Sequence, residues 1–152
     1  MKLILVALSL VASAPTAPDT FAIACSGETF SNEVQDGKIT EKKFSLPDQI
    51  FVFSESAKVA LRAMPRRQEF ENLCEIGPVG KEVEFSTGMI RVNWVGPSDW
   101  EAKTTCEFNF DRVDNKATMR TKIEWSNSHH RESEWRMICK PTQIPVFDPE
   151  ER

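Results

Sequence analysis

The feature that most constrains the fold is a period-two alternation of apolar and polar side chains in the second half of the chain. It runs through two consecutive segments, Thr104–Asp111 and Ala117–Trp125. The positions on the predominantly apolar side are Cys106, Phe108 and Phe110 in the first segment and Ala117, Met119, Thr121, Ile123 and Trp125 in the second. Because successive side chains of a strand point to opposite faces of a sheet, this pattern predicts two half-buried antiparallel β-strands.

A tight turn centred on Asp114 and Asn115 is expected to connect these strands and to set their register. The predicted inward pairs are Phe110 with Met119, Phe108 with Thr121 and Cys106 with Ile123, and the predicted outward pairs are Glu107 with Lys122 and Asn109 with Arg120. In this register inward residues meet inward residues, and complementary polar partners meet on the outer face. A third strand of the same meander is predicted over Glu134–Lys140, after a polar loop over Ser126–Ser133.

Short apolar segments separated by turn residues predict further strands upstream. They lie at residues 21–25, 42–46, 49–53, 57–63, 83–85 and 89–95. The one helix candidate is Arg66–Ile76, which has Pro65 at its entry and Gly77–Pro78 after its end, and a loop accounts for this segment equally well. We therefore predict an all-β fold, an antiparallel β-barrel or sandwich of about six to eight strands with at most one short helix.

The N-terminus has the order of a secretory signal peptide. Lys2 precedes the apolar run Leu3–Val11, which is followed by small residues and is too short to span a bilayer. We predict a signal peptide over residues 1–22, cleaved between positions 13 and 24, a single β domain over 23–140 and an extended tail over 141–152. The predicted location is secreted or periplasmic. In an alternative, Ala22–Cys25 is a lipoprotein box and the protein is a lipid-anchored envelope component through Cys25.

Four cysteines, Cys25, Cys74, Cys106 and Cys139, are spread over the chain without a CxxC pair. An even, scattered set in an exported protein predicts disulfides, for which three pairings are possible. We favour Cys25 with Cys139 and Cys74 with Cys106, because the first and last strands often lie together where a sheet closes. Cys106 with Cys139 is the rival pairing, since both lie on the inward face of the predicted meander.

Charge and motif content restrict the functional classes. The formal net charge is -4, opposite in sign to that of an ordinary nucleic-acid binder, so nucleic acid is not a predicted partner. No transmembrane helix, cofactor or metal site is predicted. The adjacent histidines His129 and His130 point to opposite sides of an extended backbone, which disfavours joint chelation. Asp99 and Glu101 could act as a general acid and base only in a cleft that raises one pKa.

The tryptophans are the remaining candidates for contact with a ligand. Trp94, Trp125 and Trp135 are predicted to fill the core, whereas Trp100 lies in a loop and is the predicted ligand-binding residue. The favoured function is a non-enzymatic envelope or secreted domain that binds a small apolar ligand or an envelope protein through loops or a barrel mouth. The alternative is a small hydrolase that uses the loop carboxylates or the histidine pair.

Four short segments together resemble small exported bacterial β proteins of unknown function. They are Phe21–Gly27, Leu61–Pro65, Phe110–Asn115 and Ile138–Pro141, and they span most of the chain after the predicted signal. The resemblance implies an exported β fold. It implies no activity, catalytic residue or cofactor.

Overall fold

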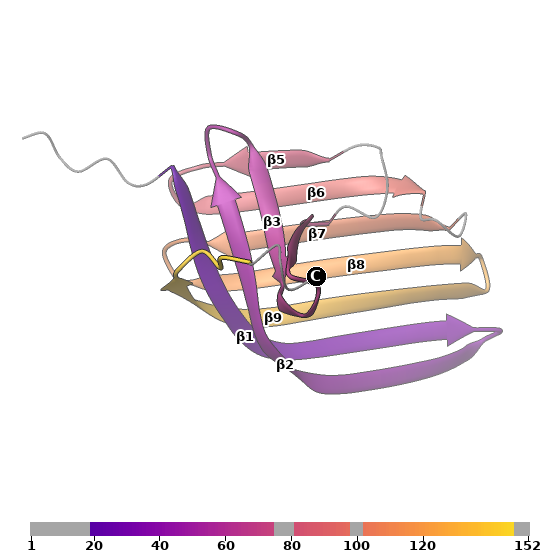
Figure 1. The fold of residues 1–152 in the computed structure, drawn as a ribbon. Helices are drawn as coiled ribbons and strands as arrows, with labels where there is room; N and C mark the ends of the chain where they lie inside the picture. The colour runs from indigo at the N-terminus through magenta and orange to yellow at the C-terminus, as the bar shows by residue number, and fades with distance from the viewer. Residues whose placement is uncertain (1–18, 75–80, 98–101, 148–152) are drawn as a thin grey trace, which may run out of the picture.

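In the part of the chain that the structure describes, nine β-strands form one sheet, which curls into a half-barrel (Figure 1). The computed structural model describes residues 19–74, 81–97 and 102–147. The strands are β1 Thr20–Gln35, β2 Lys38–Ser54, β3 Val59–Met64, β4 Glu69–Asn72, β5 Glu82–Phe85, β6 Met89–Pro97, β7 Lys103–Asp111, β8 Lys116–Ser126 and β9 His129–Thr142. A 3₁₀ turn, η1 Pro65–Arg67, lies between β3 and β4.

Neighbouring strands are all antiparallel, in the order β4-β3-β2-β1-β9-β8-β7-β6-β5. The prediction of an all-β antiparallel fold is confirmed. The predicted count of six to eight strands is wrong, since the described residues alone contain nine. The sheet is also not closed in the described residues, because β4 and β5 stand at opposite ends of the order and each pairs with one strand. Within the same residues, no helix is long and apolar enough to span a membrane.

The curl of the sheet begins at an irregularity in β1 and β2. Cys25 pairs with Gln49, but Gly27 pairs with Leu46, so the register shifts between Cys25 and Gly27. This bulge bends both strands, as an extra residue in a ladder does. Thr20–Cys25 of β1 and Gln49–Ser54 of β2, together with β3 and β4, therefore cross one face of the remaining strands (Figure 1). We call these segments the core layer and the face that they cover the inner face.

The hydrophobic core lies between the core layer and the inner face of β6, β7 and β8. Phe51 and Phe53 of the core layer are fully buried, and their ring centroids lie 5.0 and 5.9 Å from that of Phe108 on β7. Burying a side chain of this size contributes about 1.5–3 kcal/mol. The predicted inward residues Phe108 and Met137 are buried, and Ile123 is half-buried. The alternation in the second half of the chain thus identified the inner face.

The register predicted for the hairpin of β7 and β8 is wrong by two residues. Phe108 pairs with Met119 and Phe110 with Ala117, and the outer pairs shift in the same way. The cause is the turn, in which the Asp111 carboxylate accepts hydrogen bonds from the backbone N–H groups of residues 113 and 114, at 2.8 and 3.0 Å. A two-residue slip leaves every side chain on its predicted face, so the alternation could not detect it.

Two segments that were not predicted to be strands, a helix or loop candidate and a polar loop, contain strand residues in the structure. The helix candidate Arg66–Ile76 consists of the end of η1, strand β4 and a turn up to Cys74, and its last two residues lie outside the described part. Phe70 of β4 pairs with Ala63, and its ring packs 4.8 Å from that of Phe147. The predicted polar loop over Ser126–Ser133 is only two residues long, because β9 begins at His129.

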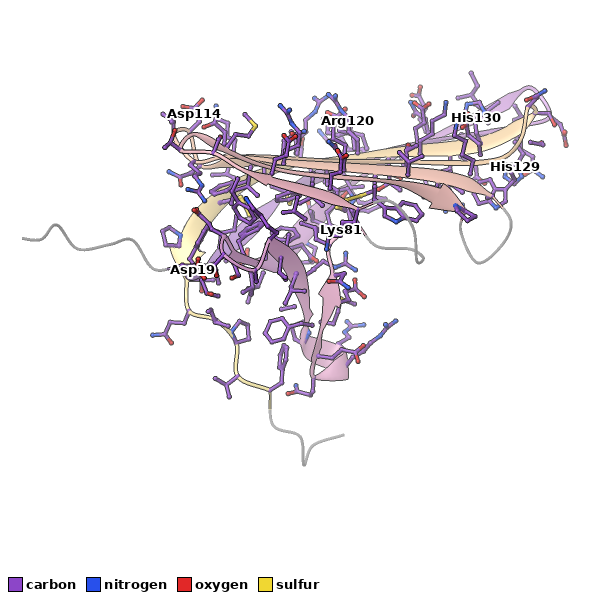
Figure 2. All side chains as sticks on the ribbon, turned by 90° about the horizontal axis from the view of Figure 1, so that it is seen from above. Asp19, Lys81, Asp114, Arg120, His129 and His130 are labelled. Atoms are coloured by element: carbon purple, nitrogen blue, oxygen red, sulfur yellow. A yellow bond between two sulfur atoms is a disulfide. The ribbon has the colours of Figure 1, made fainter. Side chains whose placement is uncertain are left out.

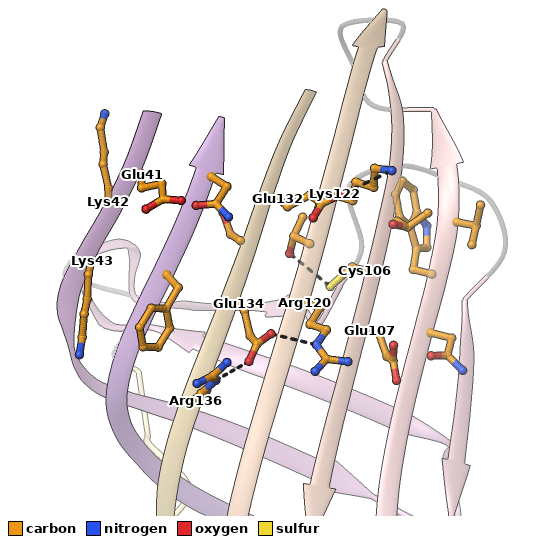
Figure 3. A pocket seen from close by; sticks show the side chains of 18 residues that line it. Glu41, Lys42, Lys43, Cys106, Glu107, Arg120, Lys122, Glu132, Glu134 and Arg136 are labelled. Carbon is orange, nitrogen blue, oxygen red and sulfur yellow. Dashed lines mark hydrogen bonds and ion pairs between the residues drawn. The ribbon is translucent and has the colours of Figure 1, made fainter. Parts of the chain in front are cut away.

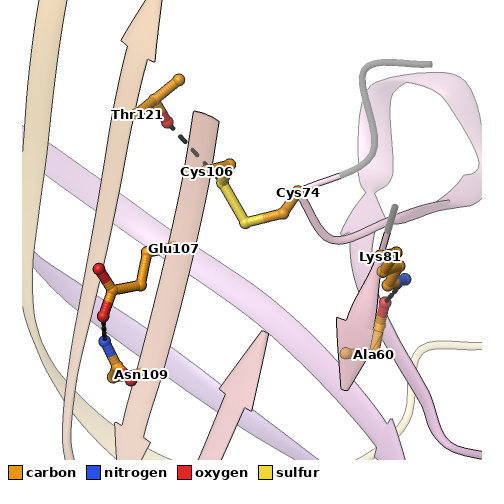
Figure 4. Close-up of a disulfide and its surroundings, with 7 residues drawn as sticks. All are labelled: Ala60, Cys74, Lys81, Cys106, Glu107, Asn109 and Thr121. Atoms are coloured by element: carbon orange, nitrogen blue, oxygen red, sulfur yellow. Dashed lines mark hydrogen bonds between the residues drawn. A yellow bond between two sulfur atoms is a disulfide. The ribbon is translucent and has the colours of Figure 1, made fainter. Parts of the chain in front are cut away.

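Two disulfides fasten the sheet. Cys25 of β1 is bonded to Cys139, its direct partner on β9, and Cys74 after β4 is bonded to Cys106 of β7 (Figure 4). These are the two pairs favoured above. The first bridge lies where β1 bends, and the second holds the end of the core layer onto the inner face. The tail predicted from residue 141 starts within β9, which continues through Thr142.

Candidate functional site

Part of the sheet reaches past the core layer and contributes almost nothing to the core. This part, the distal half-sheet, comprises Glu28–Gln35, Lys38–Ser45, Arg120–Ser126 and His129–Arg136. Thr29 is the only one of its side chains that is buried. Figure 2 shows the sheet edge-on, with His129 and His130 at this end and Asp114 at the other. Four long strand segments therefore present two largely polar faces.

The outer face of the distal half-sheet is hollowed. The hollow has a volume of about 980 Å³ and is lined by residues of β1, β2, β6, β7, β8 and β9 (Figure 3). We call it the outer hollow. Strand alternation brings Phe30, Glu107, Arg120, Glu134 and Arg136 onto this face, opposite to the core.

Most of the charged side chains in the outer hollow form ion pairs. Glu134 accepts hydrogen bonds from Arg136 and, at 3.2 Å, from Arg120, which lies directly opposite on β8. The hydrogen bond from Arg136, followed by that from Arg120, lowers the pKa of Glu134. A general acid at neutral pH needs a raised pKa, so this carboxylate is shifted in the opposite direction.

The same pairing continues along β8 and β1. The Lys122 ammonium lies 3.0 Å from Glu124 and 3.6 Å from Glu132. The hydrogen bond between Lys122 and Glu124 raises the pKa of the lysine and lowers that of the glutamate. On β1 the ring of Phe30 lies between two cations, with Arg136 4.8 Å and Lys43 5.0 Å from its centroid. The outer hollow therefore contains one aromatic side chain, Phe30, among charged side chains of both signs.

A second group of side chains lies on the inner face of the distal half-sheet. Glu33 of β1 accepts a hydrogen bond from Arg131 at 3.1 Å, and the His129 imidazole lies 3.2 Å from its other oxygen. Trp125 stacks on His129 at 4.4 Å, and Arg131 lies 5.7 Å from the indole centroid. The hydrogen bond with His129 is the main cause that lowers the pKa of Glu33. We call these four residues the inner cluster.

The histidine pair predicted as an alternative site is split between the two faces. His129 belongs to the inner cluster, whereas His130 pairs with Val34 and Glu124 on the outer face. No group of three or more potential metal ligands occurs within the described residues. Within the same part of the chain, no serine, threonine or cysteine side chain is hydrogen-bonded to His129. The loop carboxylates Asp99 and Glu101 and the predicted ligand-binding residue Trp100 lie outside the described residues.

The three other tryptophans have different environments. Trp94 is 1% exposed and belongs to the core, as predicted. Trp125 and Trp135 are half-buried on the inner face, where Arg62 of the core layer lies 5.8 Å from the Trp135 ring.

Comparisons with protein-family models, with curated proteins and with solved structures give no match. The site is therefore interpreted from its own geometry.

Sequence reasoning missed both polar sites of the distal half-sheet. Glu33 and Arg131 are separated by 98 residues, so only the register between β1 and β9 brings them together. The available signal was the length of the polar run from Glu28 to Lys43, whose alternating charges are typical of a strand pair exposed on both faces. Such a run lacks the apolar face by which strands are recognised.

Proposed function

We propose that this chain is an exported, non-enzymatic envelope or secreted domain that binds a polar partner through its distal half-sheet. The observation that carries the proposal is the extension of β1, β2, β8 and β9 beyond the core layer. Ordering a residue costs about 1–2 kcal/mol of backbone entropy, and these segments recover little of that cost through burial of apolar side chains. A binding role accounts for keeping them ordered and hollowed.

Export is supported by the disulfides. Both cysteine pairs form disulfides, which persist in oxidising compartments and are rare in the cytosol. The predicted location is therefore the periplasm or the extracellular space. Ala22 pairs with Val52 on one side and Thr142 on the other, so a cut near Ala22–Ala24 would remove paired residues of β1. This pairing favours cleavage after Ser13 or Ala14.

The non-enzymatic assignment is supported by the carboxylates of the distal half-sheet. The pKa values of Glu33, Glu124 and Glu134 are all lowered by hydrogen bonds to cationic side chains or histidine. These groups stay ionised and suit recognition by charge better than proton donation.

The lipid-anchored alternative conflicts with the Cys25–Cys139 bond, because a sulfur in a disulfide cannot also carry a lipid thioether.

Site-specific photo-cross-linking in the exporting cell tests the proposal. A benzophenone amino acid is placed at Asn32 or Glu107 in the outer hollow and, as matched controls, at the exposed Ser56 or Val113 in turns at the opposite end of the sheet. We expect one discrete adduct from the hollow positions and not from the controls. No adduct, or the same adducts from all four positions, would contradict the proposal. Mass spectrometry of the mature N-terminus tests export separately.

A further inference from the structure

One edge of the distal half-sheet is open. The segment Lys38–Leu46 of β2 pairs with β1 on one side, whereas β3 pairs only with residues 51–54 of β2. No other described strand adjoins this segment. In an antiparallel ladder every second residue directs its backbone N–H and C=O away from a given neighbour. The open edge therefore presents unpaired donors and acceptors along a straight strand, which is the template on which an added strand forms.

Hollows on both faces border this open edge. Glu41 and Lys43 line the outer hollow, and Figure 3 shows them with Lys42 along the margin of the sheet. A second hollow of about 570 Å³ includes Lys38, Thr40 and Lys42 in its lining. Because side chains of a strand alternate between faces, an added strand would direct successive side chains into the two hollows in turn. Backbone pairing combined with alternate pockets is how strand-addition sites obtain both affinity and specificity.

The charge of the open edge indicates the chemistry of its occupant. Lys38 and Lys42 lie on the same face, are exposed and form no ion pair within the described residues. The nearest carboxylate on that face of β1, Glu33, is already bonded to Arg131 and His129. On the other face Lys43 is paired with Glu28 at 2.8 Å. The second hollow is lined by Lys38 and Lys42 and by the carboxylates Glu33 and Asp36. Because Arg131 neutralises Glu33, the two lysines exceed the remaining carboxylate by one positive charge.

We propose that the edge of β2 from Lys38 to Leu46 accepts an extended acidic segment of a partner protein as an added β-strand, with its carboxylates facing Lys38 and Lys42. This inference rests on the proposed binding function and names its partner class. A second copy of the chain fits the edge less well. In a twofold antiparallel pairing that matches Glu41 with Lys43, the two copies of Lys42 lie directly opposite each other, and like charges there are destabilising.

A capped nine-residue peptide in which threonine alternates with glutamate is the probe, because its carboxylates share one face of a strand. We expect saturable binding to the mature oxidised protein, with amide chemical-shift changes centred on residues 38–46. The same peptide with lysine in place of glutamate is expected not to bind. N-methylation of alternate peptide bonds along one edge of the acidic peptide should also abolish binding, since it removes the donors for backbone pairing.

Charge reversal in the protein separates the lysines from the edge itself. Lys38→Glu with Lys42→Glu is expected to weaken binding of the acidic peptide at least tenfold. The matched control is Arg66→Glu with Lys140→Glu, which makes the same change at exposed cations that form no ion pair within the described residues, and should leave binding unchanged. Unchanged amide spectra away from the substitutions verify that both variants fold.

Three results would overturn the inference: no saturable binding of the acidic peptide, equal binding of the acidic and basic peptides, or shift changes that lie elsewhere. A dimer in sedimentation whose amide protection covers residues 38–46 would also overturn it, by making a second copy the occupant. Cross-linking from Asn32 and Glu107 does not require the open edge. Its persistence without peptide binding would remove the edge proposal and leave the proposed function standing.

Discussion

Gly27 is the residue whose substitution tests the bend of the sheet most directly. It pairs with Leu46 on β2 and Met137 on β9, immediately after the register shift. A Cβ atom built on Gly27 would lie 1.9 Å from the carbonyl oxygen of Arg136 and 2.9 Å from the Met137 Cα. Cβ atoms essentially never approach closer than 3.0 Å, so Gly27→Ala requires β1 and β9 to separate by about 1.1 Å. The clash is with backbone, which cannot rotate away as a side chain can.

The cost of Gly27→Ala follows from the contacts that this separation breaks. Overpacking typically costs about 1–3 kcal/mol, and each lost backbone hydrogen bond about 0.5–1.5 kcal/mol more. With two ladder bonds weakened beside the Cys25–Cys139 bridge, we expect a loss of about 2–6 kcal/mol in the free energy of unfolding. This is a large fraction of the roughly 5–15 kcal/mol of an ordinary domain.

Urea unfolding of the oxidised protein, followed by tryptophan fluorescence, measures this loss. Gly88→Ala is the matched control, because a Cβ at Gly88 meets nothing within 4 Å. The control is expected to be neutral or to stabilise by about 0.4–1 kcal/mol through the unfolded chain. Equal effects of the two substitutions would refute the close approach of β1 and β9 and, with it, the bend as described.

Three further predictions concern the disulfides, the paired carboxylates and the hairpin turn. The bonded cysteines of the β1–β9 bridge are 114 positions apart and those of the second bridge are 32 apart. From these loop lengths alone, replacing both cysteines by alanine should lower the free energy of unfolding by about 4.8 kcal/mol for the first bridge and about 3.7 kcal/mol for the second. Urea unfolding that gives the reverse order would contradict this. The pKa of Glu134 is lowered in the folded state, so its contribution to stability is present above the ordinary value of 4.5 and is lost as the pH falls through the lower folded value. Replacing Arg136 with glutamine should raise that pKa in a carboxyl NMR titration, and an unchanged titration would exclude the pairing. Asp111→Ala should destabilise the fold by about 0.5–1.5 kcal/mol for each hydrogen bond that its carboxylate makes to the turn. Asn115→Gly should stabilise the fold, because φ is 54° at Asn115 and glycine adopts positive φ without strain. Thermal melts that show equal effects of the two substitutions would contradict the turn geometry.

The parts of the fold that were predictable are those in which one face of a strand is buried. Phe108, Phe110, Met119 and Met137 alternate with polar residues because the core layer covers one side of their strands. The alternation assigns faces but not register, and the two-residue slip at β7 and β8 follows from that degeneracy. The turn that decides the register depends on the Asp111 side chain, which the pattern does not weigh.

The polar strands could not be assigned for the converse reason. Residues 129–133 are a strand with water on both sides, so they read as a loop, and their pairing with β1 depends on a partner almost a hundred positions away. The helix candidate Arg66–Ile76, for which a loop was the equal alternative, depended on the helical spacing of Phe70, Leu73 and Cys74. Only Phe70 lies in β4, and Leu73 and Cys74 follow it in a turn. The strand conformation of β4 is imposed by pairing with β3 and by the bridge that follows it.

The division of the sheet at Cys25 and Gly27 links stability to the proposed function. On one side of this point the strands bury Phe51 and Phe53 against Phe108, which provides most of the hydrophobic driving force. On the other side β1 and β9 continue as polar strands, held by backbone pairing and by ion pairs that contribute little individually. The Cys25–Cys139 bond lies at the boundary and keeps these two strands in register where they leave the core. A polar surface with an open edge can therefore stay ordered without an apolar face of its own, because its order is inherited from the covalently fastened strands of the core.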